Sequence, residues 1–469
     1  MKVLFLQNQP FLYFGVISIA GFLKSKEIET DVLIHTLEKN NDIFISKIKS
    51  IRPDMLGISA MSTEHSWINQ IVNAIRGAGI ETPIMVGGVH ATIYGSEIIK
   101  NKNIDFVCVG EGENTVYDVL VNLHNRGALL NISGLLINYN NNIYSNTVKT
   151  QVDIDNIIED RAIYYKRYPD LANDELKQFV VSRGCPFNCN FCYNSQIQTS
   201  QHMRYKNISN VLKELEYVKN NYGAKSIFFA DDLFTANRKW IAEFLPLYVE
   251  RIGVPFMCTT RLDIITEEIA TLLKESGCHT VSVGIETGSE RIRKEILNKN
   301  LSDDKIIKGA KILKEVGIRI QTSNMFCIPT ETVEDALETI RLNIKIKADF
   351  VFVAILMPFP DTKIASIAQE LGILKKDFSF EDLPKSFFTP KSIMGLPNVH
   401  VLENIYKVAY VCVRYPFLFS LFSNLVKFKF LDKVFLLIFY ISLFYRYKSE
   451  RNLSFFSTLK WFYRFRKSY

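Results

Sequence analysis

The fold of this chain is indicated first by the stretch Gly184-Cys185-Pro186-Phe187-Asn188-Cys189-Asn190-Phe191-Cys192, which follows a predicted strand at residues 178–184. Its three cysteines fall within eight residues, so their thiolates can converge on one metal centre. Ligation by thiolates alone favours zinc or an iron–sulfur cluster. Structural zinc would need a fourth ligand, commonly from a second cysteine pair, and no such pair follows in the sequence. The stretch therefore predicts a cluster with an open coordination position, in preference to structural zinc or three unrelated buried thiols.

From this stretch onward, the sequence alternates apolar runs with amphipathic helical patterns. Continuous apolar runs are typical of parallel strands that are buried on both faces. Six strand–helix units in succession predict an open or partial barrel, with its site at the carboxyl ends of the strands. The strands are expected at 178–184, 226–231, 255–261, 280–286, 319–326 and 350–358, with helices such as 208–221, 266–276 and 303–316 between them.

The beginning of the chain shows the same alternation. It predicts a doubly wound, Rossmann-like sheet that binds ligands at the carboxyl ends of its strands. Two glycine-bearing turns, Gly87-Gly88-Val89-His90 and Gly110-Glu111-Gly112-Glu113, fall at those ends and would let the backbone approach a large flat ligand closely. The strands are expected at 3–7, 31–35, 55–59, 83–88 and 106–112.

These patterns divide the chain into four regions. We expect the ligand-binding domain at 1–127, a linker with a hairpin at 128–175, the partial barrel at 176–365 and a helical, basic and aromatic tail at 366–469. The predicted fold class is α/β, with a doubly wound N-terminal domain, a six-unit partial (β/α)6 barrel and a helical C-terminal tail.

Composition excludes several classes of protein. The chain has 469 residues, of which 48% are hydrophobic and 22% charged, as in globular proteins. Its net charge of +7 comes from the tail, because residues 401–469 hold twelve Lys or Arg against three Asp or Glu. A uniformly basic, nucleic-acid-binding protein is therefore disfavoured.

Cysteine usage and the start of the chain point to a cytoplasmic protein. The five cysteines outside the cluster stretch stand alone, which argues against a disulfide scaffold and for a reducing compartment. The apolar start is interrupted by Gln7-Asn8-Gln9-Pro10, so it predicts a buried strand rather than a signal peptide.

The cysteine stretch, placed after the first strand of such a barrel, resembles the CxxxCxxC motif of the radical S-adenosylmethionine superfamily, and the resemblance extends over residues 178–360. It implies that Cys185, Cys189 and Cys192 hold a four-iron, four-sulfur cluster. In that family S-adenosylmethionine occupies the open iron, and one-electron reduction cleaves it to a 5′-deoxyadenosyl radical. Phe191 matches the aromatic position before the third cysteine, whose backbone resembles the family's adenine contact.

Other strand ends carry weaker matches. Gly284-Ile285-Glu286 resembles the family's cofactor-binding segment, where the acidic residue reaches the ribose or methionyl part of S-adenosylmethionine. Glu286 could instead be a carboxylate stabilised at a helix N-terminus. Arg261 either pairs with a carboxylate of cofactor or substrate or lies on the surface. Asp231-Asp232 either contacts substrate or provides a helix cap through Asp232.

The end of the fifth strand departs from the family. Cys327 and Thr330 stand where relatives usually carry glycines, so we expect their side chains to narrow the cavity. Cys327 has two interpretations: a fourth cluster ligand or hydrogen-atom donor, or a packed small residue, which is the more common role of a lone cysteine in an apolar strand.

Residues 1–127 resemble the cobalamin-binding module that precedes the barrel in one large subgroup of this superfamily. The matching segments are Pro10 to Gly15, Gly87 to Thr92 and Val109 to Glu113. The resemblance implies a cobalamin site formed by Gly87, Gly88, His90, Gly110, Glu111, Gly112 and Glu113. The Asp-x-His-x-x-Gly signature, which places a histidine below cobalt, is absent. We therefore expect no histidine ligand from this domain, with His90 near the corrin edge; a domain that kept its shape and lost cobalamin is the alternative.

Together the resemblances imply a cobalamin-dependent radical S-adenosylmethionine enzyme. We expect it to be a methyltransferase, in which methylcobalamin supplies a methyl group to an unactivated carbon. The substrate would be an unknown small or lipid-like molecule, and the electron donor a protein such as flavodoxin or ferredoxin. A radical cyclisation, rearrangement or oxidation without methyl transfer is the alternative among enzymes. A non-catalytic corrinoid- or metal-binding protein at the membrane is the alternative of another class. Methylthiotransferases bring three more cysteines in the N-terminal domain, whereas residues 1–127 contain only Cys108.

The tail has two interpretations. Tyr415–Val426 and Val434–Tyr445 are uncharged, aromatic-rich runs of twelve residues separated by lysines, too short to span a bilayer. They suit either helices in the membrane interface, attracted to anionic lipid, or a helical cap packed on the barrel.

Overall fold

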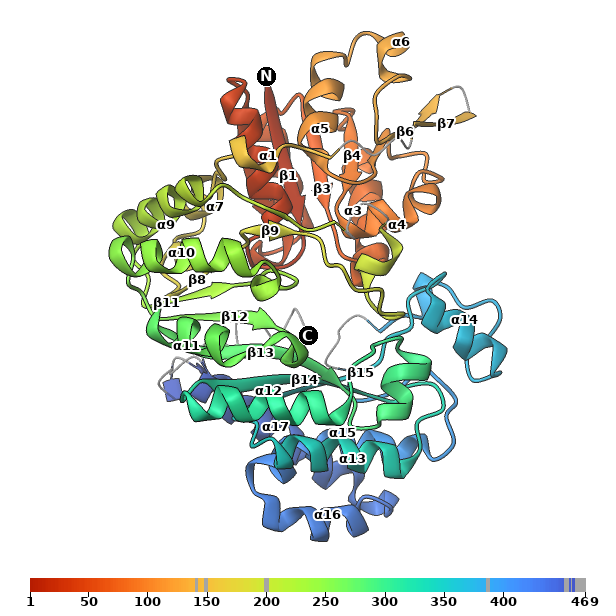
Figure 1. The fold of residues 1–469 in the computed structure, drawn as a ribbon. Helices are drawn as coiled ribbons and strands as arrows, with labels where there is room; N and C mark the ends of the chain where they lie inside the picture. Colours follow the sequence, from red (N-terminus) through yellow and green to blue (C-terminus); the bar gives the residue numbers. More distant parts are fainter. Residues whose placement is uncertain are drawn as a thin grey trace.

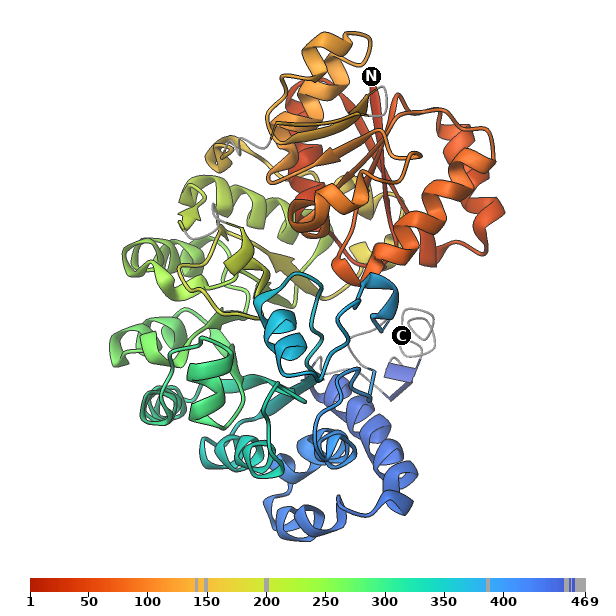
Figure 2. The same cartoon turned by 90° about the vertical axis from the view of Figure 1, so that its right-hand side faces the viewer.

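Two sheets, one after the other along the chain, organise the protein (Figure 1). The structure is a computed structural model that describes residues 1–139, 142–146, 151–197, 202–384, 389–450, 455–456 and 458–459. The first sheet and its helices form the upper part of Figure 1, the second sheet lies below them, and the last helices pack beneath the second sheet. A view turned by 90° shows α14 (Lys363–Glu370) at the level where the two sheets meet (Figure 2).

The first sheet has seven strands in the order β2-β1-β3-β4-β5-β6-β7. Its strands are β1 (Lys2–Gln7), β2 (Glu29–Ile34), β3 (Met55–Ser59), β4 (Ile84–Gly87), β5 (Phe106–Cys108), β6 (Leu135–Tyr139) and β7 (Asn142–Asn146). Its helices are α1 (Phe14–Ser25), α2 (Asn41–Ile51), α3 (His65–Gly77), α4 (Val89–Ile98), α5 (Gly112–Val121) and α6 (Arg126–Leu129). Strands β1 to β5 are parallel, and the antiparallel β6–β7 hairpin extends the sheet by pairing with β5.

Helices cover both faces of this sheet, and the side chains of β1 show why the strand is apolar throughout. Val3 and Phe5 enter the core shared with α1 and α5, whereas Leu4 and Leu6 enter the core shared with α2, α3 and α4. Successive residues of a strand point to opposite faces, so both sets are buried only because both faces are covered. This is the doubly wound arrangement that the sequence predicts, with the hairpin expected in 128–175 joined to the sheet.

The second sheet has six parallel strands in the order β15-β14-β13-β12-β11-β8, an open half-barrel. Its strands are β8 (Leu176–Phe179), β11 (Ser226–Phe229), β12 (Phe256–Thr260), β13 (Cys278–Glu286), β14 (Arg319–Phe326) and β15 (Phe350–Ile355). Its helices are α9 (Ile208–Tyr222), α10 (Arg238–Arg251), α11 (Glu267–Glu275), α12 (Asp303–Glu315) and α13 (Val333–Lys345); the short α7 (Ala162–Tyr165) and α8 (Pro169–Ala172) precede the sheet. The predicted α/β fold with a partial barrel is confirmed.

The first barrel strand is shorter than predicted. The expected strand 178–184 is divided into β8 and a separate β9 (Ser182–Arg183), which pairs with β10 (Arg204–Tyr205) instead of the barrel. The division arises because the carboxylate Oδ1 of Asp231 accepts hydrogen bonds from the backbone N–H groups of Val181 (2.9 Å) and Ser182 (2.6 Å). These groups are thereby satisfied outside the sheet, and the chain turns toward the cysteine stretch.

The last helices, α15 (Val399–Arg414), α16 (Phe419–Leu425) and α17 (Asp432–Glu450), pack on the outer side of the barrel. Tyr406 of α15 and Phe439 of α17 share a core with Phe326 of β14, with the rings of Tyr406 and Phe439 5.0 Å apart. These inner faces form the cap that was one of the two interpretations of the tail. Among the described residues, no helix is both long and apolar enough to cross a membrane.

The loop after β14 has a backbone conformation that glycine adopts without strain. Cys327 (φ 59°) and Thr330 (φ 68°) both adopt left-handed backbone conformations, at the two positions where relatives usually carry glycines. Such a conformation costs an L-residue about 1–2 kcal/mol, and the branched Cβ of threonine makes it rarer still. Cys327 is fully buried in the core, which favours its interpretation as a packed residue.

We expect Thr330→Gly to raise the free energy of unfolding by about 1 kcal/mol, because relief of the left-handed strain exceeds the entropy that glycine adds to the unfolded chain. Urea unfolding measures the change. Thr332→Gly is the matched control: Thr332 caps α13 by accepting a hydrogen bond from the N–H of Asp335, so the same substitution should lower stability. A loss of stability in Thr330→Gly equal to that of the control would contradict the strain.

Candidate functional site

The cysteine stretch forms an irregular loop at the carboxyl edge of the barrel sheet, and the segment after β13 holds it in place. Asn190 donates its backbone N–H to the carbonyl of Leu297 (2.9 Å) and its side-chain amide to the carbonyl of Ile296 (2.8 Å). Asn298 donates its side-chain amide to the carbonyl of Asn188 (2.7 Å). Among the described residues, the loop forms no strand or helix hydrogen bonds that would fix its backbone. The hydrogen bonds to the segment after β13 fix it instead.

Two aspartates after β11 fix both ends of this loop. Asp231, 1% exposed, binds the backbone and the hydroxyl of Ser182 before the cysteines, and burial raises its pKa to about 7. Asp232 accepts a hydrogen bond from the hydroxyl of Tyr193 (3.0 Å), which follows the last cysteine. The expected helix cap at Asp232 is not formed, because Asn237 caps the next helix.

Of the three thiols of this loop, that of Cys189 is buried and those of Cys185 and Cys192 are half-buried. Burial raises the pKa of all three, to about 12 for Cys192. The cations of Lys299 and Arg261 act in the opposite direction on Cys189.

Within the described part of the chain, no three His, Cys, Asp or Glu side chains surround a point that could hold a single metal ion. The donor set of three thiols on one loop fits the thiolate ligation of an iron–sulfur cluster.

Glu286 is held in a strained position at the end of β13. The pairing with β14 shifts between Gly284 and Glu286, and Glu286 adopts φ 71°. Bulges and left-handed non-glycine residues are enriched at functional sites. The side chain is 9% exposed and lies beside Lys299, whose Nζ contacts Glu286 Oε1 (2.9 Å) and donates to the carbonyl of Gly284 (2.6 Å).

Gly284 is required for this arrangement. A Cβ at Gly284 would lie 2.2 Å from Glu286 Oε1 and 2.8 Å from Lys299 Nζ. The two acceptors thus enclose an ammonium group, which is the chemistry that the amino group of S-adenosylmethionine requires. Lys299 fills both acceptors in this structure, so the methionyl contact that the resemblance implies for Glu286 stays a prediction.

Arg261 is buried, so its interpretation as a surface arginine is wrong. It is 7% exposed, pairs with Asp263 through two hydrogen bonds (3.0 and 2.9 Å) and lies 3.7 Å from the ring centroid of Phe187 in the cysteine loop. The guanidinium therefore packs on the loop. Phe191, half-buried, packs against the core of β14, β15 and the last helices.

The glycine turns of the first sheet lie together at its carboxyl edge. Gly88 adopts φ 95°, and a Cβ there would lie 3.1 Å from the carbonyl oxygen of Ala60 after the neighbouring strand. Gly110 adopts φ 94° and donates its N–H to Thr92 Oγ1 (3.0 Å), which itself donates to the carbonyl of Gly88 (2.9 Å). Gly87, Gly88 and Gly110 thus form one continuous edge.

His90 is engaged on both ring nitrogens. Its Nε2 lies 2.9 Å from Nδ1 of His65, and its Nδ1 lies 3.3 Å from the hydroxyl of Ser62. The ring is fully buried, and burial lowers its pKa to about 3, so it is neutral. His65 stacks on Phe380, which follows the barrel. Both nitrogens of His90 therefore have partners within the protein, and the absence of a histidine ligand on cobalt stays a prediction.

The turn and helix start at residues 111–113 make contacts within the protein. Sequence analysis predicts only cobalamin contacts for these residues. Glu113 Oε1 accepts hydrogen bonds from Arg183 (2.6 Å) and from the hydroxyl of Ser18 (2.6 Å), and Arg204 pairs with Glu111. A Cβ at Gly112 would lie 2.8 Å from a methyl group of Ile19, so this glycine allows α5 to approach α1. Glu113 Oε2 is buried without a hydrogen-bond partner among the described residues, which leaves an acceptor for amide groups such as those of cobalamin.

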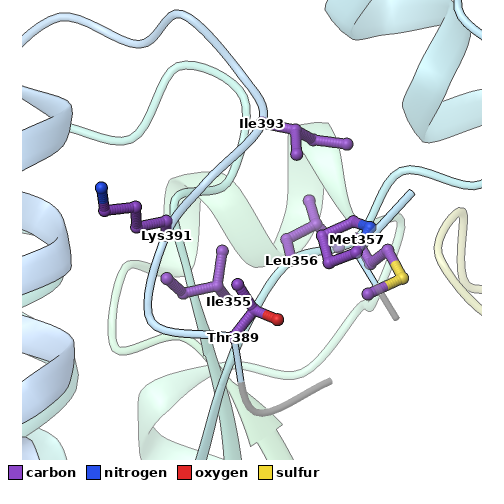
Figure 3. Close-up of a pocket in the computed structure, with 7 residues that line it drawn as sticks. Ile355, Leu356, Met357, Thr389, Lys391 and Ile393 are labelled. Carbon is purple, nitrogen blue, oxygen red and sulfur yellow. The ribbon is translucent and has the colours of Figure 1, made fainter. Parts of the chain in front are cut away.

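A small cavity opens at the carboxyl end of β15 (Figure 3). Its lining is mostly apolar and comprises Ile355, Leu356, Met357, Pro384, Thr389, Lys391 and Ile393. In Figure 3 the side chain of Lys391 extends away from Met357.

Comparison with known proteins identifies the chain. The model of the radical SAM superfamily matches residues 179–342, and the model of the B12 binding domain matches residues 12–120. An uncharacterized methyltransferase of Pyrococcus horikoshii is 30% identical over 326 residues, covering 68% of this chain and 70% of the relative. The chain belongs to the cobalamin-dependent radical S-adenosylmethionine enzymes.

Other relatives agree with this membership. The anaerobic magnesium-protoporphyrin IX monomethyl ester cyclase of Rubrivivax gelatinosus is 25% identical over 387 residues, covering 79% of this chain and 68% of the relative. The solved structure of the methyltransferase TsrM from Kitasatospora setae, with cobalamin and a [4Fe-4S] cluster bound, has a TM-score of 0.66 at 16% identity and covers 80% of this chain and 79% of that one. The family models imply a four-iron, four-sulfur cluster, S-adenosylmethionine and cobalamin as the cofactors of this enzyme.

Sequence analysis missed several residues of the site. Lys299, Arg183 and Glu64 carry no motif of their own, and only their spatial neighbours reveal them. Glu64 follows β3, is 2% exposed and accepts hydrogen bonds from the hydroxyl of Tyr13 (3.0 Å) and the N–H of Met61 (2.8 Å). Burial raises its pKa from 4.5 to about 7, although these hydrogen bonds lower it.

We expect Glu64 to make stability fall as pH rises from 5 to 7. In this window the unfolded chain has lost the proton of Glu64 and the folded protein retains it, so the folded state binds more protons and loses stability with pH. Glu64→Gln lacks this titration, so the stability of the native protein relative to the variant should fall by about 2 kcal/mol across the window.

Urea unfolding of the cofactor-free protein at several pH values measures this difference. Glu81→Gln, the same change at an exposed position, is the control and should give a pH-independent difference. Stability curves of the native protein and Glu64→Gln that run parallel from pH 5 to 7 would contradict the raised pKa.

Proposed function

We propose that this enzyme transfers a methyl group from cobalamin to an unactivated carbon of a small-molecule substrate. The observation that carries the proposal is the direct contact between the two carboxyl edges: Arg183, two residues before Cys185, pairs with Glu113 at the start of α5. Ligands at these two edges would face each other, as transfer of a group between them requires.

The proposed roles of the residues follow from their contacts. Cys185, Cys189 and Cys192 would hold the cluster, and Gly284 and Glu286 would bind the amino group of S-adenosylmethionine, since they already bind the ammonium of Lys299. When bound, these cofactors supply a 5′-deoxyadenosyl radical and a methyl group. Arg261 and Asp232 keep the cysteine loop in place. The electron would come from a small protein donor such as flavodoxin or ferredoxin.

A radical cyclisation without methyl transfer is a second candidate, because one of the relatives is named a cyclase. S-adenosylmethionine with an isotopically labelled methyl group distinguishes the two reactions. A methyltransferase places the label in the product, whereas a cyclase leaves its product unlabelled.

Our prediction for the cluster is that Cys185→Ala, Cys189→Ala and Cys192→Ala each abolish reductive cleavage of S-adenosylmethionine and lower bound iron after anaerobic reconstitution, since each removes one of three ligands. Iron analysis, visible absorbance and release of 5′-deoxyadenosine measure the effects. Cys327→Ala, at a buried cysteine outside the loop, should keep all three signals. A triple variant of the loop that retains the iron and the absorbance would falsify the assignment, and a native protein that binds a cluster without cleaving the cofactor would favour a non-catalytic role.

We also propose that the last helices contact an anionic membrane surface. The side of α17 opposite the core is an exposed apolar stripe, formed by Val434, Leu437, Ile441 and Tyr445. Phe417 and Phe430, each 78% exposed, precede α17. The exposed Lys427, Lys429 and Lys433 lie beside them in the chain, and this pairing of apolar rings with cations favours anionic lipid over a neutral partner.

Co-sedimentation with phosphatidylglycerol vesicles tests the membrane contact. We expect the protein to pellet at low salt and to be partly released at high salt, because each lysine near the surface contributes about 1 kcal/mol. The double variant Phe417→Ser/Phe430→Ser should pellet less. Leu247→Ser/Val249→Ser, at exposed apolar residues of α10, is the control and should behave like the native protein. A native protein that stays in the supernatant at low salt would exclude the contact.

A further inference from the structure

A network of charged groups joins the first sheet to the strand that leads into the cysteine loop. Arg183 of β9 directs one guanidinium nitrogen to Glu113 Oε1 (2.6 Å) and to the hydroxyl of Ser18 (2.8 Å), and its other nitrogen lies 3.1 Å from Glu111 Oε1. Ser18 also donates to Glu113 Oε1 (2.6 Å). One side chain of β9 therefore contacts α1, the turn after β5 and the first residues of α5.

A second arginine reinforces the connection. Arg204 of β10 lies opposite Arg183 in the antiparallel β9–β10 pair. It pairs with Glu111 and donates to the carbonyl of Val152 (2.7 Å), while the N–H of Val152 donates to Glu111 Oε2 (2.7 Å). The two acidic residues of the Gly-Glu-Gly-Glu turn are thus each bound by an arginine of the β9–β10 pair, which carries the cysteine loop.

The position of Arg183 makes the network more than a surface contact. Gly184, which adopts φ 98°, is the one residue between Arg183 and Cys185, so displacement of the arginine displaces the first cysteine. Glu113 is 2% exposed, and a buried carboxylate that loses its cation is left uncompensated at a large cost in free energy. The start of α5 and the start of the cysteine loop are therefore held in one relative position.

We propose that Arg183 and Glu113 are positioning residues that couple cobalamin binding in the first sheet to assembly of the cluster in the loop. Glu113 has one oxygen bound by Arg183 and the other without a partner among the described residues at the edge where cobalamin is expected. A ligand that orders either side of the network reduces the ordering that the other ligand must impose, so each raises the affinity of the other by the same factor. The inference rests on the proposed cofactor sites and adds the coupling between them.

Cobalamin affinity with and without the cluster tests this coupling. Binding of hydroxocobalamin is titrated by calorimetry, in the absence of S-adenosylmethionine, on cluster-free and on anaerobically reconstituted protein. We expect the cluster to tighten binding at least fivefold in the native protein. Glu113→Gln keeps the shape of the side chain and removes its charge, whereas Arg183→Lys keeps the charge and lacks the forked geometry. In both variants the ratio of the hydroxocobalamin affinities with and without the cluster should fall toward one, while both cofactors still bind.

The control and the opposing outcomes separate the possibilities. Asp31→Asn breaks an ion pair with Arg167 that joins the first sheet to the linker away from the loop, and it should keep the native ratio. A ratio of one in the native protein, or a native ratio in either network variant, would overturn the coupling. Glu113→Gln could also weaken hydroxocobalamin binding equally with and without the cluster, while Arg183→Lys keeps the native ratio of affinities. That result would show that Glu113 only contacts cobalamin, and it would overturn the coupling too. No binding of hydroxocobalamin to any form would instead contradict the proposed cobalamin site. If Glu113→Gln does not fold, Arg183→Lys decides the test.

Discussion

The structure depends on holding an irregular, partly buried loop of three thiols between two sheets. Such a loop has no ladder of its own, so its polar backbone groups must find specific partners elsewhere. They find them in the segment after β13, through Asn190 and Asn298, and in the carboxylates after β11. The same need explains the short first strand of the barrel, because the backbone that Asp231 binds cannot also pair with β11.

Backbone strain gathers at the edge where this loop lies. Glu286, Asn298, Cys327 and Thr330 all adopt positive φ angles, and all four follow or end barrel strands β13 and β14. Elsewhere in the barrel, helices begin at ordinary caps such as Ser302 and Thr332. Strained residues persist only where the surrounding structure fixes them, and Glu286, Cys327 and Thr330 lie at the edge where the sequence motifs also place the site.

The sequence predicted what depends on periodicity and on local motifs. Both sheets, the carboxyl edges and the cysteine loop follow from apolar runs and glycine turns, as β1 illustrates with its two buried faces. It could not predict partners that are distant along the chain. Lys299 beside Glu286 carries no local signal, and neither does Arg183 beside Glu113, whose sequence separation is 70 residues. From the sequence, Glu111 and Glu113 are therefore expected only as cobalamin contacts, and Arg261 suits a cofactor contact and a surface position equally well.

The charges around the thiols show how an apolar, buried site can still accept a negatively charged cluster. Burial raises the pKa of the cysteines, so without iron the loop carries neutral thiols and little charge. Two cations, Lys299 and Arg261, lie close enough to lower the pKa of Cys189, and each has a carboxylate partner, Glu286 and Asp263. Pairing keeps these cations from being buried alone, which would be costly. The cations are therefore already present when iron displaces the protons, and the thiolates form next to positive charge that the fold has fixed in advance.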